Sequence, residues 1–258
     1  MESTLMQVVW ATEQGSPQRR NEDFVATAPG AAVVLDGRGF PLGTEMGCEH
    51  GIAWYSRSLG TRLLARILDG LGDAPRAGAP VGPPEGAHRP GNRPLVARLA
   101  GAIADVAAAH RATCDLAHPY TPSATVMAVR VRGDVLDYLV LADSTLLLDG
   151  PRGVETVIGG RGFAAGDPSV AEQAITGTVP LADLRGVMLL TDGASRLADM
   201  FHHTDWAGLT RIVREEGPEA LIARTRKVEA TDPQAVRWPR TKPSDDATVA
   251  LMGFSGGM

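Results

Sequence analysis

Acidic residues follow apolar runs at several places in this chain. The run 33–35 leads into Asp36 and Gly37, and the run 187–191 leads into Asp192 and a second glycine. An apolar run bounded by turn residues is typical of a buried strand, so each acid is expected at the end of a rigid element. A glycine there lets a backbone carbonyl approach a ligand closely. Because hard cations take carboxylate and carbonyl oxygens, the pattern favours an oxygen-ligated metal centre.

Further acids stand next to predicted strands. Glu22 and Asp23 precede an apolar segment at 24–27, and an Asp245-Asp246 pair precedes the last one. A single Asp-Gly pair is most often a turn, and that alternative stays open for each position taken alone. Taken together, strand-end acids without a His or Cys cluster among them favour a metal centre over a set of unrelated turns.

Composition limits the classes of function. The 258 residues carry 25 Lys and Arg against 30 Asp and Glu, a net charge of −5, so nothing favours nucleic acid or an anionic membrane as a partner. No apolar run approaches the roughly 20 residues that span a bilayer, and the first residues do not resemble a secretory signal. We therefore expect a cytoplasmic protein, and the 44% apolar content can supply a core.

The hydrophobic pattern predicts an α+β domain. Helical spacing predicts helices at 48–68, 95–113, 205–216 and 218–229. Strands are predicted at 5–11, 24–27, 31–35, 125–131, 135–141, 146–148, 155–158, 187–191 and 247–252, with an irregular segment at 159–177. The Gly- and Pro-rich stretch at about 70–94 is interpreted as a flexible loop inside a single domain, 1–258; a linker between two domains is the alternative.

In this order, the segments resemble the type 2C metal-dependent phosphatases, the PPM or PP2C-like family, over nearly the whole chain. The resemblance rests on residues 21–23, 35–37, 141–144, 189–193 and 244–248. It implies a β-sandwich of two antiparallel sheets flanked by helices in α-β-β-α layers. It also implies two Mn²⁺ or Mg²⁺ ions at one end, with a third, weaker site. Two such ions lower the pKa of a bridging water and hold a phosphate for in-line attack.

The same resemblance implies roles for individual residues. Asp36 would bridge the two ions, with Asp192 and Asp245 as the other catalytic metal ligands. The Gly37 carbonyl would bind one ion, Glu22 would contact the ions through a water molecule, and Asp23 would support the cluster. Asp143 would bind the third ion, and Asp246 would lie next to the ligands without binding an ion itself.

The chain departs from the family at its phosphate-binding arginine. Gln18 stands at that position, so Arg19, Arg20 and Arg38 are the candidates for binding phosphate. The segment between Asp143 and the acid at 192 is short and lacks the family's substrate flap. The family's usual role implies a phosphatase of phosphoserine or phosphothreonine proteins, and these two departures leave room for a smaller substrate. A phosphatase of a small phosphorylated metabolite and a non-catalytic protein-binding domain remain alternatives.

Two cysteines, Cys48 and Cys114, are too few for a disulfide framework, and we expect reduced thiols that pack in the structure. A zinc site formed by these cysteines with His50 and His118 is disfavoured, because neither half has the ligand spacing of a zinc finger. Cys48 and His50 are expected to pack at the start of the first helix or to border the pocket.

Overall fold

The computed structural model describes residues 5–69 and 95–255, so the stretch at 70–94 and the loop predicted there lie outside the described residues. The strands are β1 Leu5–Glu13, β2 Phe24–Ala28, β3 Ala31–Leu35, β4 Val126–Arg132, β5 Val135–Leu141, β6 Thr145–Gly150, β7 Gly153–Ile158, β8 Ile175–Pro180, β9 Gly186–Leu190 and β10 Ala247–Ser255. The α-helices are α1 Ile52–Asp69, α2 Leu95–His110, α3 Asp192–Asp199, α4 Trp206–Glu216 and α5 Pro218–Ala230, and two short 3₁₀ turns cover Pro168–Gln173 and Leu181–Asp183.

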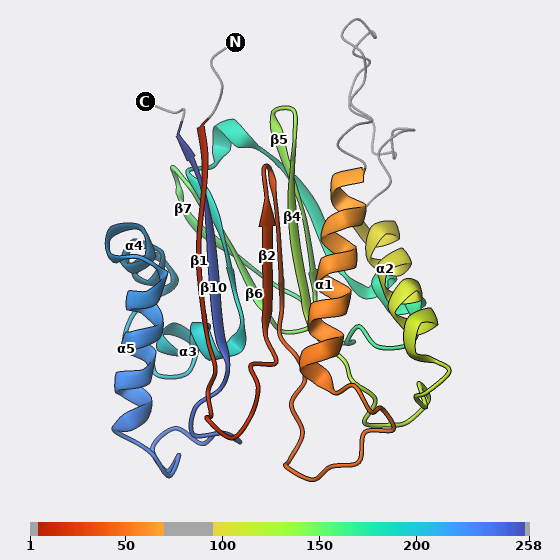
Figure 1. Cartoon of the computed structure of the whole chain (residues 1–258). Helices are drawn as coiled ribbons and strands as arrows, with labels where there is room; N and C mark the ends of the chain where they lie inside the picture. The colour runs from red at the N-terminus through yellow and green to blue at the C-terminus, as the bar shows by residue number, and fades with distance from the viewer. Residues whose placement is uncertain (1–4, 70–94, 256–258) are drawn as a thin grey trace, which may run out of the picture.

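The strands form two five-stranded antiparallel sheets that face each other (Figure 1). One sheet has the order β1-β10-β9-β6-β7, and the other has the order β2-β3-β4-β5-β8. The first and last strands are neighbours, with Leu5 opposite Ser255 in the register. Helices α1 and α2 cover one sheet and α3 to α5 cover the other, so the predicted α-β-β-α sandwich is confirmed.

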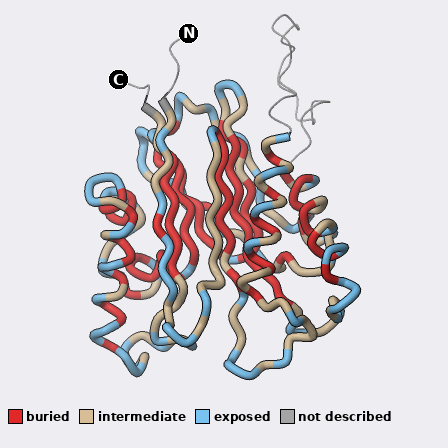
Figure 2. Tube along the Cα trace, in the orientation of Figure 1, coloured by how far each residue is buried: buried red, intermediate tan, exposed pale blue. Residues whose placement is uncertain are grey.

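Three apolar layers hold the sandwich together. Figure 2 shows the buried stretches of the strands and helices that form them. In β3, Val34 faces the core between the two sheets, whereas Val33 and Leu35 face the core under α1 and α2. A strand buried on both faces carries apolar residues at every position. This explains why the run before Asp36 has no alternating pattern.

Both long helices are shorter than the sequence pattern predicts. The prediction started the first helix at residue 48, but α1 begins at Ile52, because Gly47 and Gly51 adopt φ values of +65° and +79°. Such left-handed backbone cannot continue a right-handed helix. The helix predicted to end at residue 113 ends at His110. Cys48 and Cys114 therefore lie in the loops next to the two helices.

Two elements were missed. Strand β8 begins inside the segment that was predicted to be irregular, and its residues are exposed or half-buried, so no apolar alternation marked it. Helix α3 begins directly at Asp192, where the Asp-Gly pair looked like a turn. Within residues 5–69 and 95–255, none of the helices has the length and apolar character needed to cross a bilayer.

Candidate metal centre

Antiparallel pairing brings the predicted acids to one end of the sandwich, the lower end in Figure 1. Phe24 at the start of β2 pairs with Leu35 at the end of β3, which sets Asp23 beside Asp36. In the other sheet, β9 ends where β10 begins, which sets the start of α3 beside residues 245 and 246. The Thr191 hydroxyl donates to Asp23 at 2.9 Å and joins the two sheets.

Asp246 organises the backbone around the acids. Its carboxylate accepts hydrogen bonds from the backbone amides of Gly15 at 2.8 Å and Glu22 at 2.6 Å. Asp246, which was predicted to lie next to the metal ligands, therefore fixes two neighbouring loops. Asp36 is fixed by its backbone, because its amide donates to the Thr125 hydroxyl at 3.2 Å and its carbonyl accepts from the Thr125 amide at 2.8 Å.

The acids raise one another's pKa. Burial, then the charges of Asp23, Asp192 and Asp245, hold the pKa of Asp36 well above its usual range. Burial likewise raises the pKa of Asp23 well above normal. Desolvation and the charge of Asp245 raise the pKa of Asp192 to about 6, although that residue as a whole keeps an exposed face.

Lys242 lies among the acids and was not predicted. Its ammonium donates to Asp245 at 2.5 Å, and it stands with the Glu22 carboxylate over the backbone of Gly39. Burial alone would lower the pKa of Lys242, but the charges of Asp245, Glu22 and Asp36 outweigh this and raise it. No motif in the Pro-containing segment around residue 242 marks this lysine as part of the centre.

Arg196 was also missed, because helix α3 was missed. Its guanidinium is buried and donates to Glu229 at 2.8 Å and to Asp245 at 3.1 Å. Had α3 been recognised, the spacing of four residues from Asp192 would have placed Arg196 on the same helix face.

Glycines permit the close approach of the segments that carry the acids. A Cβ on Gly193 would lie 2.0 Å from the carbonyl oxygen of Asp246, and one on Gly15 would lie 2.4 Å from the backbone carbon of Asp245. A Cβ on Gly37 would lie 2.6 Å from the carbonyl oxygen of Glu22. The glycine after Asp36 is thus required by packing within the protein, whatever its carbonyl binds.

Asp143 lies at the edge of the group. It is exposed, and its charge contributes to the raised pKa of Asp192. Ala142, the residue before it, adopts a left-handed backbone with φ of +69°, a conformation that favours glycine. Ala142 therefore adopts a turn conformation that is usual for glycine.

The three candidate arginines occupy different surroundings. Arg19 donates to the carbonyl of Phe40 at 2.6 Å and lies close enough to Glu22 to lower that carboxyl's pKa, although burial raises it overall. The guanidinium of Arg38 lies over the rings of Phe40 and Phe163, at 5.3 and 5.0 Å from their centroids. Arg20 is exposed.

The donor set suits a hard divalent cation. Carboxylates supply the oxygens that Mg²⁺ and Mn²⁺ prefer, and Asp23 Oδ1 is buried without a hydrogen-bond partner among the described residues. The acids share one end of the sandwich, but their carboxylate oxygens do not lie as close together as the ligands of a bound ion. Among the described residues, the group of ligand side chains close enough to hold an ion lies elsewhere. The ammonium of Lys242 would have to leave Asp245 for cations to bind.

Three solved structures are similar to the structure of this chain. The serine/threonine phosphatase PstP/Ppp of Mycobacterium tuberculosis is similar over 97% of this chain and 99% of its own, with a TM-score of 0.60 and 15% identity. The catalytic domain of PstP in complex with two manganese ions has a TM-score of 0.57 and 14% identity, over 98% and 100% of the two chains. RsbX in complex with magnesium has a TM-score of 0.54 and 11% identity, over 99% and 98%.

At the level of sequence, no family model and no curated protein matches this chain. Sequence identities of 15% and below support a shared fold but not a shared activity. The near-complete coverage, together with the two antiparallel sheets and their flanking helices, identifies this chain as having the fold of the PPM/PP2C-type serine/threonine phosphatases.

Proposed function

We propose that this protein is a metal-dependent phosphomonoesterase that hydrolyses phosphoserine and phosphothreonine esters of proteins with a metal-activated water. The observation that carries the proposal is the gathering of Asp23, Asp36, Asp192 and Asp245 at one end of the sandwich. Mutual repulsion and burial make such a group costly without cations, which is the expected state of a cation site before loading.

Most of the predicted residues have a role in this proposal. Asp36, Asp192 and Asp245 would hold two Mn²⁺ or Mg²⁺ ions together with the Gly37 carbonyl, and Asp143 would serve a third. When bound, the ions supply a water of lowered pKa and neutralise phosphate charge. Fold relatives support this choice of metal, because PstP is seen with manganese and RsbX with magnesium.

The chain's own side chains would then position the substrate. Arg19 offers a guanidinium group close to Glu22, and Arg38 follows Asp36 by two residues; a guanidinium can bind two phosphate oxygens at once. Lys242, once displaced from Asp245, offers a third cation. Asp23 and Asp246 accept hydrogen bonds from the surrounding chain and thereby hold the loops that carry the ligands.

The test is hydrolysis of an aryl phosphate by the purified protein with Mn²⁺, with Mg²⁺ and with chelator. We expect activity with either metal and none with chelator, and loss of activity in Asp36→Asn. Activity that survives in chelator would overturn the proposal. A panel of phosphopeptides against small phosphorylated metabolites then separates the protein substrate from the metabolite alternative. Metal binding without hydrolysis of any of these would leave the non-catalytic binding domain.

A further inference from the structure

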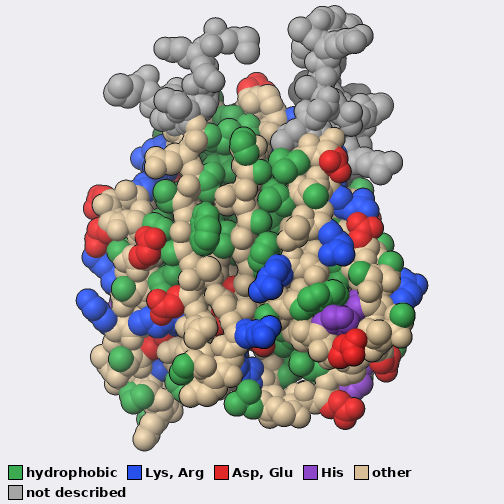
Figure 3. All heavy atoms as spheres, in the orientation of Figure 1, with side chains coloured by type: hydrophobic (Ala, Val, Ile, Leu, Met, Phe, Trp, Pro, Cys, Tyr) green, Lys and Arg blue, Asp and Glu red, His purple; other side chains and the backbone are tan. Residues whose placement is uncertain are grey.

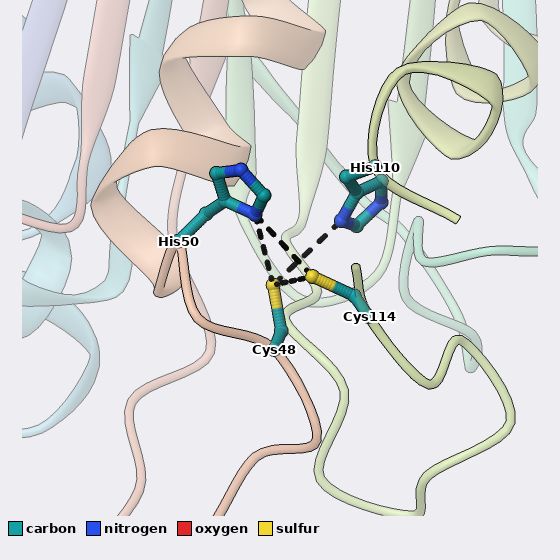
Figure 4. A group of neighbouring side chains, drawn as sticks. All are labelled: Cys48, His50, His110 and Cys114. Carbon is teal, nitrogen blue, oxygen red and sulfur yellow. Dashed lines mark hydrogen bonds between the residues drawn. The ribbon is translucent and has the colours of Figure 1, made fainter. Parts of the chain in front are cut away.

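A second group of ligand side chains lies away from the acids. Cys48 and His50 precede α1, His110 is the last residue of α2, and Cys114 follows it by four positions. Their sulfur and nitrogen ligand atoms all lie within 4.8 Å of one another (Figure 4). The two halves come from loops more than fifty residues apart in sequence, and the ends of the two helices bring them together.

We propose that Cys48, His50, His110 and Cys114 form a structural zinc site that fastens the start of α1 to the end of α2. Cys₂His₂ is a common donor set of structural zinc, and four protein ligands leave no open position for chemistry. Thiolate with imidazole also selects zinc over Mg²⁺ and Mn²⁺, so the two centres would take different metals.

The distances approach those of a tetrahedral site. Zinc bonds of about 2.3 Å to sulfur and 2.0 Å to nitrogen set neighbouring ligands roughly 3.5 Å apart, or roughly 3.8 Å for two sulfurs. His50 Nδ1 lies 3.7 Å from Cys48 Sγ and 3.3 Å from Cys114 Sγ, and His110 Nδ1 lies 3.6 Å from Cys48 Sγ. The two sulfurs are 3.1 Å apart, so zinc would separate them slightly.

The imidazole rings are held in place by packing. His50 stacks on Trp54 with ring centroids 4.3 Å apart, and the ring of His110 lies 5.1 Å from the same tryptophan. His110 is 2% exposed, and its Nε2 has no hydrogen-bond partner among the described residues. Packing therefore holds the buried ring of His110 with its Nδ1 directed at the sulfur of Cys48, at 3.6 Å.

The rejected zinc site had the wrong histidine. His118 is not a member of the group, and His110 takes its place. The sequence pattern suggested His118 because of its proximity to Cys114, whereas the helix end at His110 sets the actual neighbour. Histidine side chains reach the surface beside the lower ends of α1 and α2 (Figure 3).

The site would also fix the loop that follows Asp36. The Asp115 amide donates to the Gly47 carbonyl at 2.7 Å, and the Arg38 amide donates to the Ser123 carbonyl at 2.9 Å. Loop 38–51 and loop 111–123 are therefore already joined at two places, and zinc would add a third, stronger connection. Arg38, a candidate for binding phosphate, is carried by this loop.

The principal test is zinc binding by reduced, metal-free protein, measured by competition with a colorimetric chelator. We expect one zinc per chain, and Co²⁺ in its place should show thiolate charge-transfer bands of a tetrahedral site. Asp36→Asn, which disables the acidic centre, should keep this zinc, so the outcome does not depend on the phosphatase proposal. The matched control His118→Ala, in the same loop, should also keep it.

Removing a ligand gives the opposite result. Cys48→Ser, Cys114→Ser and His110→Ala should weaken zinc binding by more than about tenfold, the loss found even for indirect partners of metal ligands. Because these variants can lose their fold, His50→Ala at a half-buried position provides a second test, and circular dichroism checks each variant. Wild-type protein that binds zinc no better than Cys48→Ser would overturn the proposal.

Discussion

At the scale of single residues, the group of acids at the end of the sandwich costs stability. Asp36 is held in place by its own backbone hydrogen bonds to Thr125, so it cannot move away from the neighbouring acids at little cost. Its pKa is raised because burial and three other carboxylates disfavour its charge. Lys242 offsets part of this repulsion while no metal is present.

Asp36→Asn should therefore stabilise the metal-free protein while abolishing hydrolysis. The folded-state pKa of Asp36 lies above the unfolded value, so the charged carboxylate destabilises the fold at neutral pH. That cost disappears as the pH falls through the folded pKa toward about 4. The gain in unfolding free energy at pH 7 should be at least on the order of 1 kcal/mol, and it should vanish near pH 4. Urea unfolding in chelator at both pH values measures it; an equal gain at pH 4 and pH 7 would contradict the electrostatic cause.

Lys242→Gln should act in the opposite direction on stability. Loss of the ammonium leaves Asp245 and its neighbours without a counter-charge, so the metal-free protein should lose about 1 kcal/mol, a modest value because the side chain is 30% exposed. Manganese should bind more tightly, because no ammonium has to be displaced. Calorimetric titration with Mn²⁺ checks this. Lys227→Gln on α5, at an exposed position, is the control and should change neither quantity.

At the scale of elements, the centre depends on how closely three backbone segments approach. Residues 245 and 246 lie against Gly15 on one side and Gly193 on the other, at distances that leave no room for a side chain. Arg196 on α3 adds a buried link to Glu229 on α5 and to Asp245. The start of α3 is therefore positioned by contacts with the loop before β10 as well as by its own strand.

Gly193→Ala should push α3 away from that loop. Its Cβ would lie 2.0 Å from the Asp246 carbonyl oxygen, so we expect a loss of about 1–3 kcal/mol in unfolding free energy. Metal affinity should fall with it, because Asp192 begins the displaced helix. Gly160→Ala is the matched control, since a Cβ there meets nothing within 4 Å and should cost less than about 0.5 kcal/mol. Equal effects of the two substitutions would argue against close packing as the cause.

Elements with strong apolar patterns were predictable, and elements defined by tertiary contact were not. Strand β3 was predicted with its observed bounds because a doubly buried strand is apolar throughout. Strand β8 lies at a sheet edge with little buried surface, and α3 begins with an Asp-Gly pair that also suits a turn. Lys242 and His110 enter their sites through the fold alone. The residues adjacent to them in sequence do not indicate which side chains will be their neighbours in space.

At the scale of the molecule, three apolar layers run through the described residues. Leu189 and Val34 belong to the layer between the sheets, and this layer connects the two outer layers under the helices. The sheets therefore share their inner core rather than forming separate units. We propose on this ground that the chain unfolds as the single domain expected from its sequence.

Unfolding should then be cooperative across both helical layers. Trp54 packs in the layer of α1 and α2, whereas Trp238 packs in the layer of α3 to α5. In two variants that each retain one of these tryptophans, the urea midpoint from fluorescence should coincide with the midpoint from far-UV circular dichroism. A fluorescence transition that precedes the dichroism in one variant would indicate that its layer unfolds separately.

The pairing of β1 with β10 has a consequence for synthesis on the ribosome. Strand β10 lies between β1 and β9, so β1 cannot join its sheet until β10 has left the exit tunnel. Asp245 and Asp246 directly precede β10 and arrive equally late. A nascent chain can form the hairpin of β4 and β5 early, but contacts between distant segments form slowly and late. The group of acids can therefore assemble only after β10 has been translated.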